Sequence, residues 1–317
     1  MSNFFFTVVD KNFVLRALAL YKSFEKFNKK ELFFIVSLDD ESNQIVRKFS
    51  TKKLISINIR DFDQNLLKKI KNSRNYREFC WTIKSVSFCY IFKKYKYVKW
   101  VFYIDSDSMV LSSFRKAINN NFDAILTPHR PINQFFKMII KNVGNYNAGF
   151  LGLKNNYNGK KILDYWKTKC IESCTDHPKE GKYGDQIYLS DIVQKFKKIN
   201  NDPHKGLNVA PWNLCDDNNI INSKNLPKDI IFVHFQGFKI LNMHIFNLYS
   251  DNFKVSKITF QKIYLPYIKL LKETFAEIKK KEKKFEQKIE LNINLKLVLK
   301  KLFYNLGNLK LIYSNEK

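Results

Sequence analysis

Trp100-Val-Phe-Tyr-Ile104-Asp105-Ser106-Asp107 is the most informative stretch of the chain, because five bulky residues run directly into two carboxylates. A short apolar run rich in aromatic and β-branched residues predicts a strand that is buried on both faces of a parallel sheet. Ligands of open α/β sheets bind beyond the carboxyl ends of the strands, where Asp105 and Asp107 are expected. Residues one apart in an extended chain point the same way, so both carboxylates can bind one divalent cation.

A second pair of carboxylates with the same spacing, Asp61 and Asp63, shows that this short motif also arises by chance. The pair precedes Gln64-Asn-Leu-Leu-Lys-Lys-Ile70, which has the pattern of a helix start. Here the carboxylates are expected to cap the helix and to interact favourably with its dipole. A function for Asp105 and Asp107 therefore depends on other motifs in the chain.

Strand and helix patterns alternate through the first hundred residues. The expected strands are residues 4–9, 31–38, 54–59 and 100–104, and the expected helices are residues 13–27, 42–50 and 79–95. This alternation is typical of an α/β fold with a mostly parallel sheet flanked by helices. The sequence has neither a Gly-x-Gly-x-x-Gly motif after the first strand nor a Walker loop, which argues against a standard dinucleotide or P-loop site.

Four further motifs follow residue 122, where the alternation becomes irregular. Asn147-Ala-Gly149 predicts a turn before an apolar strand, and a glycine there lets the backbone approach a ligand closely. Asp185-Gln186 opens an expected helix, so Asp185 is either its N-cap or a residue of the site. Pro211-Trp212-Asn213 comes next, and His234 ends an apolar run as either a buried structural residue or a ligand.

Taken in this order, the motifs resemble those of the retaining glycosyltransferases of family eight. This is the GT-A group that includes glycogenin and the bacterial lipopolysaccharide galactosyl- and glucosyltransferases. The resemblance covers about residues 1 to 240 and is carried by Asp10, Asp105, Asp107, Asn147 to Gly149, Asp185, Gln186, Trp212, Asn213, His234, Gly237 and Lys239. It implies a GT-A, Rossmann-like fold.

The resemblance also implies a metal-dependent reaction. A sugar would pass from a nucleotide-diphosphate donor, with uridine as the expected nucleoside, to a cell-surface glycan or lipid-linked acceptor, with retention of configuration. Asp105, Asp107 and His234 would bind Mn²⁺ (or Mg²⁺), which holds the diphosphate of the nucleotide-sugar. Oxygen ligands with one imidazole suit Mn²⁺.

Other site residues follow from the same resemblance. Around the transferred sugar, the implied catalytic residues are Asn147, Asp185 and Gln186. The implied donor-binding residues are Asp10 and Asn12 at the base and ribose, Lys84 and Lys239 at the phosphates, and Asp105, Ser106, Gly149, Trp212 and Gly237.

Two features depart from the family pattern. The late motif places Lys239 two residues after Gly237, one fewer than is common, and no Pro-Trp pair follows. The segment from Asn72 to Glu78 offers no clear counterpart of the Arg that members usually have. An inverting GT-A relative therefore stays open, with Asp185 as the carboxylate base that inversion needs.

A formal net charge of +27 suggests that the protein could bind other kinds of partner, nucleic acid first among them. The excess is Lys, without an Arg-rich recognition helix, an RNA-binding aromatic motif or a zinc finger, so we expect no nucleic-acid partner. A basic chain also suits an anionic membrane surface or a phosphorylated substrate. The rivals to a glycosyltransferase are a non-catalytic basic module that binds membrane or nucleic acid, and a sugar nucleotidyltransferase. The latter should have a Gly-rich basic loop after its first strand, and residues 7–14 contain none.

Composition divides the chain into an expected catalytic domain, residues 1–251, and a basic helical tail, residues 252–317. Within the tail, residues 263–278 and 289–312 have amphipathic helical patterns. These helices would bind an anionic membrane, or pack on the catalytic domain or a second subunit of a homo-oligomer. Five cysteines without a zinc pattern, and no apolar run near the ~20 residues of a membrane span, predict a cytoplasmic protein, free or peripheral on the inner face of the membrane.

Overall fold

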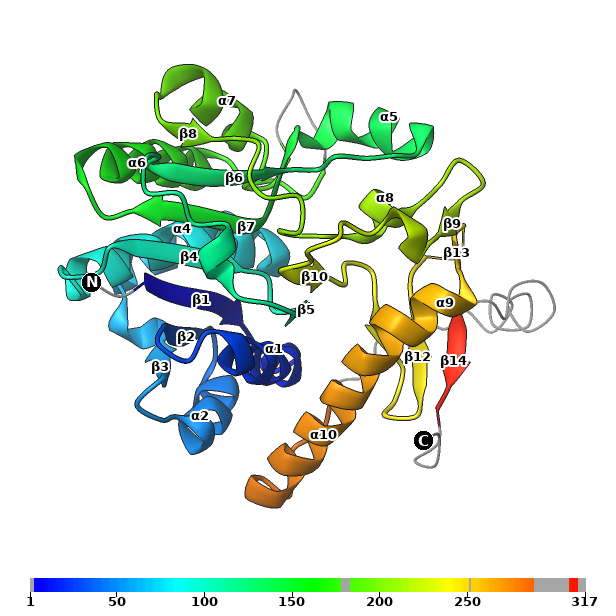
Figure 1. The fold of residues 1–317 in the computed structure, drawn as a ribbon. Coiled ribbons are helices and arrows are strands. Elements are labelled where there is room, and N and C mark those ends of the chain that lie inside the picture. The colour runs from blue at the N-terminus through cyan, green and yellow to red at the C-terminus, as the bar shows by residue number, and fades with distance from the viewer. Residues whose placement is uncertain (1–2, 178–182, 251, 288–307, 313–317) are drawn as a thin grey trace.

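The computed structural model describes residues 3–177, 183–250, 252–287 and 308–312 (Figure 1). Strands and helices alternate through its first hundred residues, as predicted. The elements are β1 (Asn3–Val9), α1 (Val14–Phe27), β2 (Leu32–Ser37), α2 (Asp40–Phe49), β3 (Leu54–Asn58), the 3-10 turn η1 (Ile59–Asp61), α3 (Gln64–Asn72), α4 (Tyr76–Lys94) and β4 (Trp100–Ile104).

The central sheet has seven strands in the order β3-β2-β1-β4-β7-β6-β8. The later strands are β6 (Ala124–Pro128), β7 (Tyr146–Lys154) and β8 (Ile199–Asn200). β7 runs antiparallel to both of its neighbours, β4 and β6, while the other pairs are parallel. The predicted fold class, a mostly parallel sheet flanked by helices, is confirmed.

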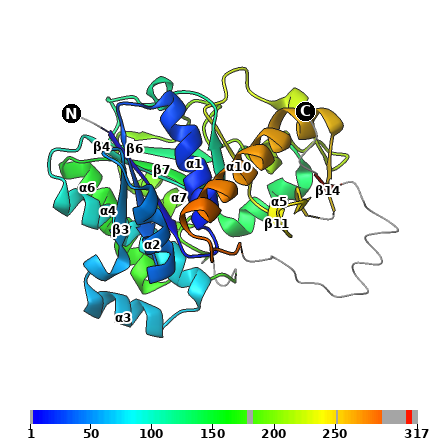
Figure 2. The same cartoon turned by 90° about the horizontal axis from the view of Figure 1, so that it is seen from below.

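Alternate residues of the central strands contribute to two hydrophobic cores, one on each face of the sheet. Phe5 and Phe102 belong to the core that includes residues of α1, whereas Phe4, Phe6 and Tyr103 belong to the core under α4. The helices α6 (Tyr157–Glu172) and α7 (Tyr188–Lys195) also contribute to the second core. Figures 1 and 2 show the helices on both sides of the sheet. Burial on both faces explains why these strands are continuously apolar.

Side-chain capping sets the starts of α3 and α4. Asp63 accepts hydrogen bonds from the N–H groups of Asn65 and Leu66, which makes it the N-cap of α3. The interpretation of the Asp61–Asp63 pair as a capping motif is therefore confirmed for Asp63. α4 begins at Tyr76, earlier than the predicted residue 79, because Asn75 and Glu78 form a reciprocal capping box.

Short elements, together with the longer helices α5 and α10, build the remainder of the described chain beside the sheet. They are β5 (Ser108–Val110), η2 (Phe114–Lys116), α5 (Gln134–Val143), α8 (Pro211–Leu214), β9 (Ile220–Ile221), η3 (Ser223–Asn225), β10 (Phe232–His234), β11 (Lys239–Ile240), β12 (Ile245–Asn247), β13 (Lys254–Val255), α9 (Lys257–Thr259), the π-helical turn η4 (Phe260–Tyr264), α10 (Leu265–Lys281) and β14 (Leu309–Leu311). β5 pairs antiparallel with β10, and this pairing sets His234 opposite Ser108.

The helix predicted over residues 263–278 is present as η4 and α10. It packs against the rest of the chain, since the rings of Tyr267 and Phe235 stack with their centroids 3.9 Å apart. The helix predicted over 289–312 is wrong for its last residues, because Leu309–Leu311 form β14 and pair with β12. An available edge strand outweighs helical periodicity there, and residues 288–307 lie outside the described chain. The division at residue 251 and the membrane role of the tail stay predictions.

None of the helices that the structure describes is both long and apolar enough to pass through a lipid bilayer.

Candidate active site

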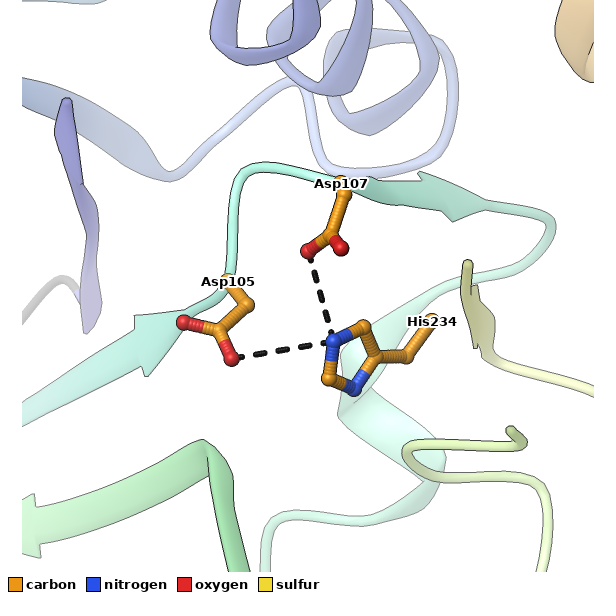
Figure 3. Close-up of side chains that lie close together, drawn as sticks. All are labelled: Asp105, Asp107 and His234. Carbon is orange, nitrogen blue, oxygen red and sulfur yellow. Dashed lines mark ion pairs between the residues drawn. The ribbon is translucent and has the colours of Figure 1, made fainter. Parts of the chain in front are cut away.

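The ends of β4 and β10 bring together two carboxylates and one imidazole (Figure 3). The Nε2 atom of His234 lies 3.3 Å from Oδ1 of Asp107 and 3.7 Å from Oδ2 of Asp105. One ligand atom from each of the three residues falls within 4.8 Å of the other two. The backbone holds this arrangement, since the N–H of Phe235 donates to the carbonyl of Asp107 at 2.7 Å. The three residues predicted as metal ligands therefore form one cluster.

Asn208 orients the imidazole of His234. Its amide nitrogen donates to Oδ1 of Asn147 at 2.9 Å and to Oγ1 of Thr127 at 3.0 Å, which leaves its amide oxygen 3.1 Å from Nδ1 of His234. That oxygen can only accept, so Nδ1 carries the proton and Nε2 faces the two carboxylates. Sequence reasoning missed Asn208. Its backbone has a positive φ of 54°, but no sequence pattern indicates this conformation.

Charges within the cluster shift the pKa values of its members. Burial alone would lower the pKa of His234, but Asp107 and then Asp105 raise it above its ordinary value. Burial alone would raise the pKa of Asp107, but His234 and then Arg16 hold it below its ordinary value. Without a bound cation these shifts favour an imidazolium paired with carboxylates, and a cation would have to replace any proton on Nε2.

Gly149 makes room for this imidazole. A Cβ atom at residue 149 would lie 2.8 Å from two atoms of the His234 ring and 2.5 Å from Oδ1 of Asn147, closer than side chains tolerate. The amide oxygen of Asn147 instead accepts from the N–H of Gly149 at 2.8 Å. The glycine of the Asn147-Ala-Gly149 motif therefore serves the packing of a site residue, and it also lines the cleft described below.

Lys84 connects the cluster to Asp185. Its Nζ lies 3.2 Å from Oδ1 of Asp105 and 3.3 Å from Oδ2 of Asp185, and its side chain is only 7% exposed. Burial alone would lower the pKa of Lys84, but the two carboxylates raise it above its ordinary value. Burial raises the pKa of Asp185, although Lys84 opposes this shift. Tyr103 donates a further hydrogen bond to Asp105.

A cleft with a volume of about 1010 Å³ contains the cluster. Most residues that the sequence predicts to bind a donor or its sugar line this cleft: Asp10, Asn12, Lys84, Asp105, Ser106, Asp107, Asn147, Gly149, Asp185, Gln186, Trp212 and His234. Their places in the chain run from the turn after β1 to the end of β10. The fold therefore gathers these separate motifs around one space.

Asp10 shapes the turn at one side of the cleft. Its carboxylate accepts from the backbone N–H groups of Asn12 and Phe13, and from the side-chain amide of Asn12 at 2.8 Å. Cys80 and Tyr76, both on α4, also line this region. The turn is thus fixed by Asp10 before any ligand arrives.

Asp185 does not cap a helix. α7 begins at Tyr188, and no side chain in the described part of the chain forms a cap hydrogen bond at its N-cap, Ile187. Gln186 donates from its side-chain amide to the carbonyl of Val143 at 2.8 Å, so its remaining polar atom is the amide oxygen. Both residues line the cleft.

Another wall of the cleft is formed by aromatic and uncharged side chains. Trp212 packs with its ring centroid 5.3 Å from that of His129 and 6.1 Å from that of His234. Burial lowers the pKa of His129 to about 4, so this second histidine is neutral near pH 7. Its Nε2 lies 3.3 Å from the amide nitrogen of Asn147.

The structure does not bring Gly237 and Lys239 to the cleft. Lys239 is exposed on β11, and Gly237 has a positive φ of 84° in a turn packed against Tyr249. Gln236 and Tyr249 line the cleft instead. The phosphate contact expected of Lys239 therefore has no support in this geometry.

Within the segment from Asn72 to Glu78, where no clear counterpart of the family's Arg was expected, the structure places Arg77 at the cleft. Arg77 lines the cleft from the first turn of α4, with its guanidinium 3.9 Å from the carboxylate of Asp176. Arg74 instead donates to the hydroxyl of Thr82 and to a backbone carbonyl, which makes it structural. Arg77 belongs to α4 because the helix begins at Tyr76, whereas a helix predicted to begin at residue 79 leaves Arg77 outside it.

Comparison with known proteins agrees with the fold. No protein-family profile matches the chain. Two uncharacterized proteins of Bacillus subtilis (strain 168) are similar in sequence. YfnF is 29% identical over 257 residues, which are 77% of this chain and 84% of YfnF. YfnD is 26% identical over 288 residues, which are 88% of this chain and 92% of YfnD.

Among solved structures, the galactosyltransferase LgtC in complex with donor and acceptor sugar analogs is similar to this chain. The TM-score is 0.51 at 13% sequence identity, and the match covers 85% of this chain and 95% of LgtC. Identity this low bears on the fold alone. The chain has the GT-A fold.

Proposed function

We propose that this protein is a glycosyltransferase that moves a sugar from a nucleotide-diphosphate donor, with uridine as the nucleoside, to a cell-surface glycan or lipid-linked acceptor. The observation that carries the proposal is the cluster of Asp105, Asp107 and His234 at the end of β4, inside a cleft of about 1010 Å³. Ligands of open α/β sheets bind at this edge. The GT-A fold supports the same reading, and membership of family eight is part of the proposal.

The donor atoms of the cluster fit a divalent cation of the Mn²⁺ or Mg²⁺ type. Two carboxylates supply oxygen, and His234 presents the Nε2 side of its ring because Asn208 fixes Nδ1 as the protonated nitrogen. When bound, such a cation supplies a Lewis acid that stabilises the negative charge of the departing diphosphate. Lys84 keeps Asp105 in place and offsets the charge of the two carboxylates beside it.

Asn147, Asp185 and Gln186 are proposed to surround the transferred sugar. Asp185 would bind sugar hydroxyls, and the amide oxygen of Gln186, whose amide nitrogen is occupied by Val143, would face the reacting carbon. This assignment favours retention. The ion pair between Asp185 and Lys84 also argues against Asp185 as a free general base for an inverting reaction.

Asp10 and Asn12 are proposed to contact the base and ribose of the donor, with Arg77 as an additional candidate for its phosphates. The turn held by Asp10 presents a fixed surface, and Arg77 is mostly exposed at the cleft. A guanidinium in this position matches phosphate geometry. The protein is proposed to act in the cytoplasm, free or peripheral on the inner face of the membrane.

Thermal unfolding with a panel of nucleoside diphosphates, each with Mn²⁺ and with EDTA, tests the proposal. A nucleotide at 100 times its dissociation constant should add about 2.7 kcal/mol to the free energy of unfolding. We expect the shift with uridine diphosphate and Mn²⁺ and not in EDTA. If none of the nucleotides raises the melting temperature, the protein is better explained as a basic binding module. The affinity of such a module for a polyanion would fall steeply with salt.

Asn208→Gly is expected to weaken Mn²⁺ binding by roughly 10- to 100-fold, as loss of a group that orients a metal-binding histidine does. The substitution removes the acceptor for Nδ1 of His234, and glycine adopts the positive φ of residue 208 without strain. Isothermal titration with Mn²⁺ measures the effect. Asn219→Gly is the matched control, since Asn219 also has a positive φ, of 58°, outside the cluster. Equal affinities in the two variants would contradict the role of Asn208.

A further inference from the structure

The helix α5 leaves three of its six apolar side chains exposed. Its sequence, Gln134-Phe-Phe-Lys-Met-Ile-Ile-Lys-Asn-Val143, has six apolar residues, and Phe136 alone among them is buried. Four of the ten large apolar side chains that are exposed in the described part of the chain lie in α5 or just before it: Ile132 (41%), Phe135 (42%), Met138 (61%) and Ile139 (38%). Apolar side chains gathered in this way mark an interaction surface.

The exposed residues form a stripe rather than a scatter. Residues three and four apart share a helix face, so Phe135, Met138 and Ile139 lie side by side. Lys137 and Lys141, both exposed, share the face next to this stripe. The segment from Ile132 to Val143 contains no Asp or Glu. α5 thus has an apolar stripe bordered by positive charge, which is the pattern of a helix that lies in a membrane interface.

The stripe is continuous with the cleft. Phe136, Ile139, Ile140 and Val143 of the same helix line the cleft that contains the metal-type cluster. Figure 1 shows α5 standing apart from α6 and α7, the helices that cover the sheet beside it. The stripe is one side of this helix, beside Phe253, on which the rings of Phe135 and Phe136 pack. Its basic border suits an anionic lipid surface better than a groove in a second protein.

We propose that the α5 stripe docks on a bilayer with anionic headgroups and sets the mouth of the cleft at the lipid surface. Phe135 and Met138 enter the interface, while Lys137 and Lys141 remain with the headgroup phosphates. The stripe borders the first residues of the basic tail (residues 252–317), since the ring centroid of Phe135 lies 5.7 Å from that of Phe253. Vesicle binding is measured without nucleotide, so its outcome is independent of whether the protein transfers a sugar. Its consequence for the proposed function is an acceptor that is presented from the membrane.

Sedimentation of the full-length chain with phosphatidylglycerol vesicles tests the proposal. We expect Met138→Glu to weaken vesicle binding roughly tenfold, since it replaces an apolar contact by a charge that anionic lipid repels. Tyr157→Glu is the matched control: Tyr157 is 71% exposed at the start of α6, and its variant should bind like the wild type. Met138 is largely exposed, so its variant should melt at the wild-type temperature.

A second measurement locates the contact directly. Tryptophan fluorescence of Met138→Trp should be quenched by bromine-labelled phosphatidylglycerol beyond the wild-type level, and that of Tyr157→Trp should not. The proposal is overturned if the wild type does not bind vesicles, if Met138→Glu binds as tightly as the wild type, or if only Ile258→Glu, on α9 of the tail, weakens binding. A change of oligomeric state in Met138→Glu without vesicle binding would assign the stripe to a second copy of the chain instead.

Discussion

Asp107→Asn is expected to abolish sugar transfer and Mn²⁺ binding while leaving the fold intact. The side chain keeps its shape but loses the charge that pairs with Nε2 of His234 at 3.3 Å. Loss of one of three ligands should lower turnover at least about 10³-fold, since stabilisation of the leaving charge is lost with the cation. In Mn²⁺-free buffer the free energy of unfolding should fall by only about 1.5–3 kcal/mol, which is the usual net contribution of a hydrogen bond to a charged group.

Asp61→Asn is the control for this experiment, because Asp61 belongs to the other Asp-x-Asp pair and lies in the exposed turn η1. Turnover, Mn²⁺ titration and urea unfolding are measured on both variants. A variant at Asp107 that loses several kcal/mol of stability but still binds Mn²⁺ would show that Asp105, Asp107 and His234 form a structural cluster of ion pairs.

The pH dependence of Mn²⁺ binding provides an independent check. Because Asp107 and Asp105 raise the pKa of His234 above its ordinary value of 6.5, a cation must displace a proton from Nε2 at any pH below that raised pKa. The affinity for Mn²⁺ should therefore rise with pH, by up to about tenfold per unit, and level off above the pKa of His234. In the metal-free protein the contribution of His234 to folding stability changes with pH in the opposite direction to the Mn²⁺ affinity. A raised histidine pKa stabilises the fold at low pH, and this contribution is lost as the pH rises through that pKa.

The parallel half of the fold could be predicted because its strands are buried on both faces. Strands such as Trp100–Ile104 are continuous apolar runs, and helical periodicity between them is clear, so the boundaries of β4 and α1 agree with the sequence to within a residue. The clustering of Asp105 and Asp107 with His234 was also predictable, although only through the resemblance of the ordered motifs. No local pattern connects a carboxylate on β4 to an imidazole at the end of β10.

Features that depend on tertiary contacts were not predictable. Asn208 gains its place from three partners far away in the chain, Thr127, Asn147 and His234, and nothing in its local sequence marks it. Lys239 follows Gly237 at nearly the family spacing, yet the strand β11 directs it to solvent. β14 exists because β12 offers an edge to residues that would otherwise favour a helix. In each case the deciding partner lies elsewhere in the chain.

Lys84→Met should be the most destabilising single change at the site. The Nζ of Lys84 lies within 3.3 Å of carboxylate oxygens of both Asp105 and Asp185, and Asp185 is almost fully buried. Removing one partner of a buried ionic group leaves uncompensated charge, which typically costs about 3–5 kcal/mol. Lys93→Met, in the exposed last turn of the same helix, is the control and should cost less than about 0.5 kcal/mol.

The pH dependence of this loss separates charge from packing. Burial already raises the pKa of Asp185, and removal of Lys84 should raise it further. A carboxyl group with a folded-state pKa above its unfolded value binds more protons in the folded state, so its contribution to stability falls as the pH rises between the two values. The deficit of Lys84→Met in urea unfolding should therefore be largest near pH 7 and shrink toward pH 4. A deficit that is constant with pH would assign Lys84 a packing role and remove the charge link between Asp105 and Asp185.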